Sequence, residues 1–175
     1  MLRRVLSSGR KLQSCKSLVI TAQNEQLLYR FFSRNSSSND DVGVVHVSTD
    51  EALDTTTAAL RKIGWDEQDA RLQAEIMTAA ALCGNNQGLV KMYQPVLMKP
   101  AENCGKPKVT KETFNSAVID ANQAPGMLAA VTAADLAISK LRGTPDSAIS
   151  IVTTHNSSTN SGQLAFYVDR IARQG

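Results

Sequence analysis

The chain has 175 residues, of which 42% are hydrophobic and 20% are charged, so its composition is that of a globular protein and not of a disordered one. Its net charge of +3 divides unevenly, because residues 1–34 carry seven basic and one acidic side chain and residues 35–175 carry twelve basic and fifteen acidic ones. The acidic body argues against nucleic-acid binding, the short apolar runs against a transmembrane helix, and the three cysteines without a CxxC pair against a zinc site or a disulfide framework.

The first 34 residues have the composition of a mitochondrial transit peptide, because they are rich in Arg and Ser and nearly free of acids. A basic, partly apolar helix near the N-terminus would be drawn to anionic membranes and to the mitochondrial import machinery. The sequence RFFS at residues 30–33 resembles a presequence processing pattern, so we expect cleavage before Ser33. We therefore expect a mitochondrial matrix protein, with a linker over residues 35–47 and one domain over residues 48–175. A basic tail without a targeting role is the alternative.

The domain is predicted to begin with a pair of helices. A β-branched run over Val42–Val47 could form a short strand ahead of them. Ser48 opens a capping box, which predicts the start of a helix that Gly64 closes. Asp66 is an N-cap for a second helix, which Gly84 closes.

A mixed helix and strand pattern follows the helix pair. A polar turn leads into a third helix, interrupted by a proline, and then into a loop. The later elements expected are strands over Val109–Thr113 and Ala117–Asp120, a helix from Pro125 to Leu141, a strand over Ala148–Thr153 and a helix over Gln163–Gln174. The fold class is therefore α/β or α+β, without a regular βαβ alternation. Because GxGxxG and GxxxxGK[ST] motifs are absent, neither a Rossmann fingerprint nor a P-loop is expected.

Three stretches of this domain together resemble the malate/L-lactate dehydrogenase family. That family also contains ureidoglycolate and sulfolactate dehydrogenases and is distinct from the Rossmann-type lactate and malate dehydrogenases. Residues 60–89 look like its N-terminal helix pair and its Arg-Gly-x-x-Ser-His-Gly-Leu turn. Residues 117–126 resemble its Val-Asp-Gly segment, and residues 149–167 resemble its strand and Ser-x-His-x-Gly loop. The match covers nearly all of residues 48–175 and corresponds to roughly the N-terminal half of a family chain.

The resemblance implies an NAD(P)-dependent oxidoreductase that acts on the CH–OH group of a small 2-hydroxy acid, in a homodimer. Such a reaction needs a base for the hydroxyl proton and a cation for the carboxylate, and His and Arg suit these roles. In this family the roles look to fall on histidines of the two loops and on an Arg after the first loop.

The positions that match these family residues hold different side chains here. Gln87 and Asn160 stand at the two histidine positions, as the candidate catalytic residues. Asn86 and Lys91 stand at the serine and arginine positions, as the candidate substrate-binding residues. Lys91 keeps the positive charge but loses the planar fork of arginine. Neither Gln87 nor Asn160 titrates usefully, so neither can serve as a general base.

His155, five residues before Asn160 on the same loop, is an alternative base, and an ordinary solvated loop histidine is the competing interpretation. The resemblance also implies cofactor contacts, with NAD or NADP, at Asp120, Ser161 and Gly162. Asp120 could equally begin the turn into the next helix. No metal site is expected.

Two functions follow from these observations. The first is the NAD(P)-dependent dehydrogenase that the family resemblance implies. The second is a catalytically silent or truncated relative that acts as a mitochondrial structural or interaction subunit, in a homodimer or a hetero-oligomer. The replacement of both loop histidines and the missing C-terminal half favour the second over an enzyme that turns over substrate by itself.

Overall fold

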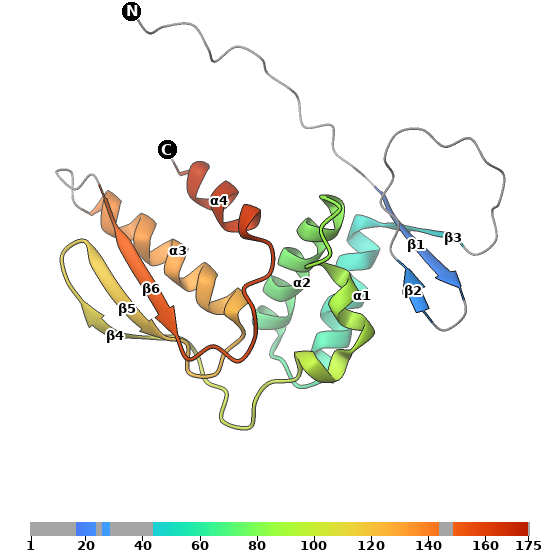
Figure 1. The fold of residues 1–175 in the computed structure, drawn as a ribbon, viewed down its shortest axis with the longest axis horizontal. Coiled ribbons are helices and arrows are strands. Elements are labelled where there is room, and N and C mark those ends of the chain that lie inside the picture. The colour runs from blue at the N-terminus through green and yellow to red at the C-terminus, as the bar shows by residue number, and fades with distance from the viewer. Residues whose placement is uncertain (1–16, 24–25, 29–43, 144–148, 175) are drawn as a thin grey trace, which may run out of the picture.

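The computed structural model describes residues 17–23, 26–28, 44–143 and 149–174 (Figure 1). The helix expected near the N-terminus, the processing pattern before Ser33 and most of the linker lie outside these residues.

A small antiparallel sheet precedes the helices. Strands β1 (Ser17–Gln23), β2 (Gln26–Leu28) and β3 (Val44–Ser48) pair in the order β2-β1-β3. Strand β3 confirms the strand expected over Val42–Val47, of which the first two residues are outside the described part. Strands β1 and β2 lie within the segment that we interpret as a transit peptide, where the sequence pattern predicts no strand.

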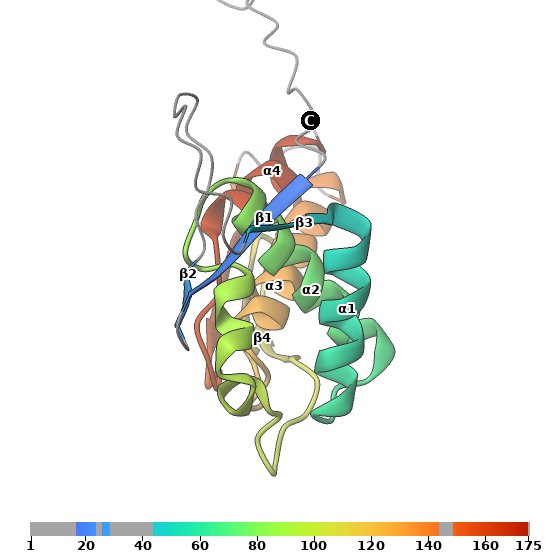
Figure 2. The ribbon, with the colours of Figure 1, turned by 90° about the vertical axis from the view of Figure 1, so that its right-hand side faces the viewer.

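Helices α1 (Thr49–Lys62) and α2 (Glu67–Leu82) lie side by side, as predicted (Figure 2). The side chains of Ser48 and Asp66 each accept a hydrogen bond from the backbone N–H three residues on, at 3.1 and 2.8 Å. These bonds satisfy N–H groups that a helix start leaves without an intrahelical partner. Gly64 follows α1 with a φ of 116°, a backbone conformation that only glycine adopts readily.

The third helix takes the form of two short 3₁₀ helices, η1 (Leu89–Tyr93) and η2 (Pro95–Met98). A proline has no backbone N–H to donate, so residue 95 interrupts a continuous α-helix. The predicted interruption is confirmed. Of the two short helices, η1 packs against α2.

A second sheet forms the other half of the fold. Strands β4 (Lys108–Glu112), β5 (Ser116–Asp120) and β6 (Ile151–His155) pair in the order β4-β5-β6, with β4 antiparallel and β6 parallel to β5. Helix α3 (Gly126–Arg142) connects β5 to β6 and covers one face of the sheet, so this part is a single βαβ unit (Figure 1). The expected hairpin and helix are confirmed, and β6 runs further toward the C-terminus than predicted.

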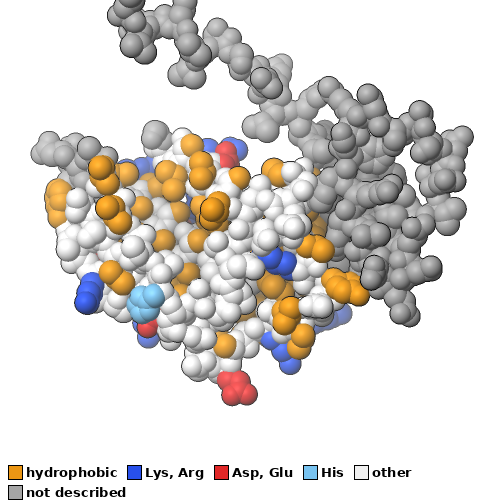
Figure 3. Space-filling view, viewed as in Figure 1, with side chains coloured by type: hydrophobic (Ala, Val, Ile, Leu, Met, Phe, Trp, Pro, Cys, Tyr) orange, Lys and Arg blue, Asp and Glu red, His pale blue; other side chains and the backbone are white. Residues whose placement is uncertain are grey.

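Helix α4 (Leu164–Ala172) follows β6 and packs on α3 and α2, which confirms the expected last helix. Tyr167 is its buried side chain. Three exposed hydrophobic side chains at helical spacing, Leu164, Val168 and Ile171, lie on its outer side. Hydrophobic atoms gather over α4 on the face shown in Figure 3.

The hydrophobic core lies where the helix pair meets α3. Leu60, Ile76, Met77 and Met127 are fully buried there, and Tyr167 packs into the same cluster. Each such side chain contributes about 1.5–3 kcal/mol through burial of its apolar surface. No helix in the described part of the chain is long and apolar enough to cross a membrane.

Candidate functional site

The candidate residues lie on two segments that are far apart in the sequence. The first segment is the turn over residues 83–88 after α2, together with η1, which carries Lys91. The second is the loop over residues 156–163 between β6 and α4, which carries Asn160. We call these the first loop and the second loop.

Two glycines allow the loops to approach the helices that hold them. A Cβ on Gly88 would lie 2.6 Å from the carbonyl oxygen of Met77, so the first loop rests directly on the backbone of α2. A Cβ on Gly126 would lie 2.6 Å from the carbonyl oxygen of Thr159, and the Gly126 N–H donates to the same oxygen at 3.2 Å. The start of α3 therefore holds the second loop in place.

Lys91 and Asn160 meet between the two loops. The ammonium group of Lys91 donates a hydrogen bond to Asn160 Oδ1 at 2.5 Å. The backbone N–H of Gly162 donates to the same oxygen at 3.3 Å, which orients the Asn160 amide. Partial burial lowers the pKa of Lys91, because the charged form loses hydration. No ion pair within the described ranges offsets this loss at Lys91.

A cavity of about 350 Å³ opens beside this pair. That volume is within the range of small-molecule pockets. Its polar lining residues are Lys91, Gln94, Thr159 and Asn160, and its hydrophobic lining residues are Val90, Tyr93, Leu97, Met98 and Met127. The lining thus joins one positive charge to an extensive apolar wall.

The sequence motifs indicated Lys91 and Asn160 but not the apolar wall. Met98 and Met127 lie on η2 and α3, and nothing in the local pattern of either element distinguishes them from ordinary core residues. Both residues reach the cavity because they belong to the same buried hydrophobic cluster, which joins segments far apart in the sequence.

Asn86 and Gln87 do not line this cavity. The Gln87 side-chain amide donates to Asn86 Oδ1 at 3.4 Å, and the Gln87 backbone N–H donates to Asn85 Oδ1 at 2.8 Å. These contacts stabilise the turn after α2. The structure therefore separates the candidate residues of the first loop, with Lys91 at the cavity and the two amides in the turn before it.

Asp120 and His155 are neighbours at the carboxyl ends of the parallel strands β5 and β6. Asp120 Oδ1 accepts hydrogen bonds from the Asn122 backbone N–H and from the Asn156 side chain, both at 2.8 Å. These bonds favour the carboxylate and hold the pKa of Asp120 below its usual value. His155 is exposed and is not part of the cavity lining. Within the described ranges, no group of three or more metal-binding side chains occurs.

The three candidate cofactor positions all have structural contacts. The carbonyl of Ser161 accepts a hydrogen bond from the buried Tyr167 hydroxyl, whose pKa is raised by burial. Gly162 has a φ of 74°, and a Cβ on it would lie 3.2 Å from Ile76. The carboxylate of Asp120 is held by its own turn. These contacts give all three positions a structural role, and NAD(P) contacts at these positions stay a prediction.

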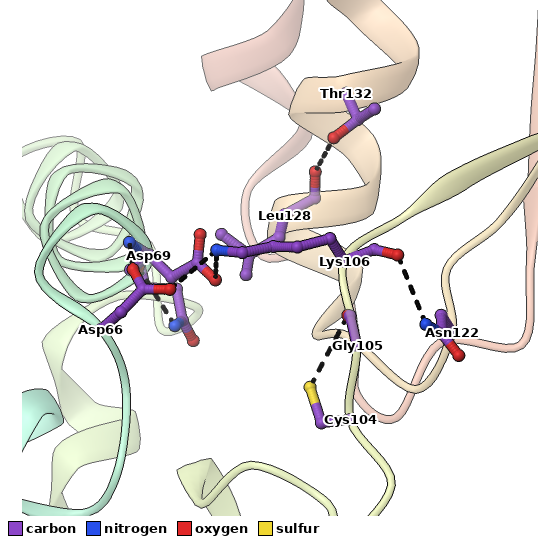
Figure 4. A network of polar contacts seen from close by, with 9 residues as sticks. Asp66, Asp69, Cys104, Gly105, Lys106, Asn122, Leu128 and Thr132 are labelled. Carbon is purple, nitrogen blue, oxygen red and sulfur yellow. Dashed lines mark hydrogen bonds and ion pairs between the residues drawn. The ribbon is translucent and has the colours of Figure 1, made fainter.

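A polar network that the sequence did not reveal holds the loop before β4. Lys106 forms ion pairs with Asp66 and Asp69 at the start of α2, at 2.8 and 2.5 Å (Figure 4). The Gly105 N–H donates to the Asn122 carbonyl at 2.8 Å. The loop is thus tied both to the helix pair and to the turn that leads into α3.

The family assignment follows from comparison with known proteins. Residues 47–175 match the profile of the malate/L-lactate dehydrogenase family. The chain belongs to this family. A search of curated proteins finds no match. The resemblance inferred from the sequence is confirmed, as is the mixed α/β fold, which corresponds to part of the family's fold.

This chain spans less than half of the length of the solved structures that share its fold. Malate dehydrogenase from Entamoeba histolytica is 25% identical with a TM-score of 0.65, and the match covers 74% of this chain and 36% of that one. Sulfolactate dehydrogenase from Methanocaldococcus jannaschii is 24% identical with a TM-score of 0.62, covering 72% and 37%. Delta1-piperideine-2-carboxylate reductase from Pseudomonas syringae pvar. tomato is 21% identical with a TM-score of 0.61, covering 74% and 39%. The latter two show the fold alone.

Proposed function

We propose that this family member is part of an NAD(P)-dependent oxidoreductase that acts on the CH–OH group of a small 2-hydroxy acid, and that Lys91 binds the substrate carboxylate. The observation that carries the proposal is the position of Lys91 at the cavity, in hydrogen-bond contact with Asn160 of the second loop. Family membership supports the class of reaction, because the matched residues include both loops.

The chemistry of the cavity supports binding more strongly than proton transfer. An ammonium group binds a carboxylate through charge-assisted hydrogen bonds, which are stronger than those between neutral groups. The nine lining residues include no histidine and no carboxylate, so neither usual kind of general base faces the cavity. Asn160 orients Lys91 and can donate to a ligand through its amide nitrogen, but it cannot accept the hydroxyl proton.

The absence of histidine and carboxylate side chains from the nine lining residues favours a second candidate function. A chain that binds no hydroxy acid and lacks a base would be a catalytically silent relative, acting as a mitochondrial structural or interaction subunit. The homodimer or hetero-oligomer that such a role requires stays a prediction.

The turnover test uses the full chain with NAD or NADP and with malate, lactate, ureidoglycolate or sulfolactate. We expect no reduced cofactor above background, measured by its absorbance. A rate that disappears in Lys91→Ala and persists in Lys99→Ala would show instead that the chain turns over substrate by itself. Lys99 is a suitable control because it is exposed and outside the cavity lining.

A binding measurement separates the two candidate functions. If a hydroxy acid binds to the wild-type chain and binding is lost in Lys91→Ala, the carboxylate-binding role is supported. If no hydroxy acid binds, the silent-subunit role is supported.

A further inference from the structure

The cavity beside Lys91 is lined by one charged side chain and by mostly hydrophobic ones. Among the nine lining residues, Lys91 is the one with a charged side chain at neutral pH. Most of the other lining residues are hydrophobic, and they include Leu97, Met98 and Met127. A ligand in this cavity would therefore meet one cation and, for most of the remaining lining, hydrophobic side chains.

Lys91 has hydrogen-bond donors left for one anionic group. An ammonium group has three N–H donors, and within the described residues Asn160 accepts one of them. The other two donors match the oxygens of one carboxylate. Because partial burial of Lys91 is not offset by an acidic side chain in the described ion pairs, a ligand carboxylate would supply the counter-charge.

The apolar wall makes a second anionic group unfavourable. Met98 is 6% exposed and Met127 is 1% exposed, so both belong to the packed core and do not move aside easily. A second carboxylate or a sulfonate placed against them would lose hydration without gaining a cation. An apolar side chain of the ligand would instead bury hydrophobic surface, chiefly that of the exposed Tyr93 and Leu97 in the same lining.

We propose that the cavity selects a small monocarboxylic 2-hydroxy or 2-oxo acid with an apolar side chain over a dicarboxylic or sulfonated acid. This inference rests on the proposed role of Lys91 in carboxylate binding and names the substrate class of the same site. Lys91 holds the carboxylate, Asn160 orients Lys91, and the hydrophobic lining, chiefly the exposed Tyr93 and Leu97, receives the ligand's side chain.

The test measures binding to the full chain by isothermal titration calorimetry. The probes are 2-hydroxy-4-methylpentanoate, malate, sulfolactate and the uncharged 2-hydroxy-4-methylpentanamide. We expect the monocarboxylate to bind about tenfold or more tightly than malate or sulfolactate, because a desolvated, unpaired charge costs more than the tenfold equivalent of free energy. The amide should bind at least about tenfold more weakly than its acid, because it has no charge to pair with Lys91.

Two pairs of variants locate the effect. Lys91→Met retains most of the length of the unbranched side chain and removes its charge. It should abolish the preference for the acid over the amide, whereas Lys99→Met should leave that preference unchanged. Leu97→Arg adds a second cation at the exposed rim of the apolar wall and should raise the affinity for malate. Leu97→Gln is its control, because it adds polarity without charge.

The possible outcomes separate this inference from the proposed function. If malate binds the wild-type chain as tightly as the monocarboxylate, and Lys91→Met weakens both, the selectivity is overturned while carboxylate binding at Lys91 stands. If none of the acids binds, or if Lys91→Met changes no affinity, both the selectivity and the proposed function fail.

Discussion

Lys91 and Asn160, 69 residues apart in the sequence, are joined by a hydrogen bond of 2.5 Å between the Lys91 ammonium group and Asn160 Oδ1. This bond connects η1 to the loop between β6 and α4, so it links the helix pair to the βαβ unit. In the family resemblance both residues stand at functional positions, and here an amide and an ammonium group contact each other directly. The pair is therefore the centre of the site that we propose.

Replacing Gly126 by Ala should destabilise the fold. The new Cβ would lie 2.6 Å from the carbonyl oxygen of Thr159, and because that atom belongs to the backbone, the second loop would have to move. We expect a loss of about 1–3 kcal/mol in the free energy of unfolding, the usual cost of overpacking. The measurement is urea denaturation followed by circular dichroism.

Gly143→Ala is the matched control for this change. Its nearest neighbour, the Ser139 carbonyl oxygen, would be 3.4 Å from the new Cβ, an ordinary contact, and its φ is −74°. We expect no loss, or a gain of up to about 1 kcal/mol, because alanine restricts the unfolded chain. Equal losses in both variants would contradict the backbone contact at Gly126.

Asp66 should contribute to the loss of stability in acid. Its pKa is held below the usual value by the hydrogen bond from the Asp69 backbone N–H and then by Lys106. A carboxylate with a lowered folded-state pKa stabilises the fold above its unfolded pKa of about 3.9, and this stability is lost as the pH falls through the folded value. Asp66→Asn retains the helix cap but not the charge, so its free energy of unfolding should fall less than that of the wild type between about pH 6 and pH 3.

The control for Asp66→Asn is Glu102→Gln, which removes an exposed carboxylate from the loop between η2 and β4. Denaturant titrations of the three proteins at several pH values make the comparison. If the free energy of unfolding of Asp66→Asn falls with pH as steeply as that of the wild type, protonation of Asp66 does not contribute to the loss of stability in acid.

Leu60 should contribute far more to stability than Leu164. Leu60, on the buried side of α1, is 0% exposed, whereas Leu164 on α4 is 68% exposed. Leu60→Ala should cost about 2–5 kcal/mol, because it leaves a cavity in a packed region. Leu164→Ala should change the free energy of unfolding by no more than about 0.5 kcal/mol. Thermal or urea unfolding of both variants checks this, and a large cost at Leu164 would show that its outer face is covered in solution.

We propose that residues 1–34 direct the chain to mitochondria, and the test is the location of a full-length chain with a C-terminal tag. We expect mitochondrial staining and a processed chain that begins at Ser33. Replacing Arg3 and Arg4 by Ala should weaken import, because it removes positive charge from the leader. Replacing Lys99 and Lys111 by Ala removes as much charge from the body and should not. Cytosolic staining of the wild type would refute the proposal.

The sequence by itself determined the local features of the fold. Ser48 and Asp66 cap their helices through bonds to backbone groups only three residues away, and Gly64 ends α1 through its own φ. Such signals are predictable because they depend on neighbouring residues alone. The family resemblance, carried by short stretches in a fixed order, was predictable for the same reason.

Only the tertiary structure decided which candidate residues share a cavity. Lys91 and Asn160 come together and Gln87 does not, because their positions depend on how η1 and the second loop pack around the start of α3. The apolar wall depends on the same packing, since Met98 and Met127 come from elements with no local signal for a binding site. Contacts between distant segments follow from burial of the whole core, so a pattern read along the chain cannot specify them.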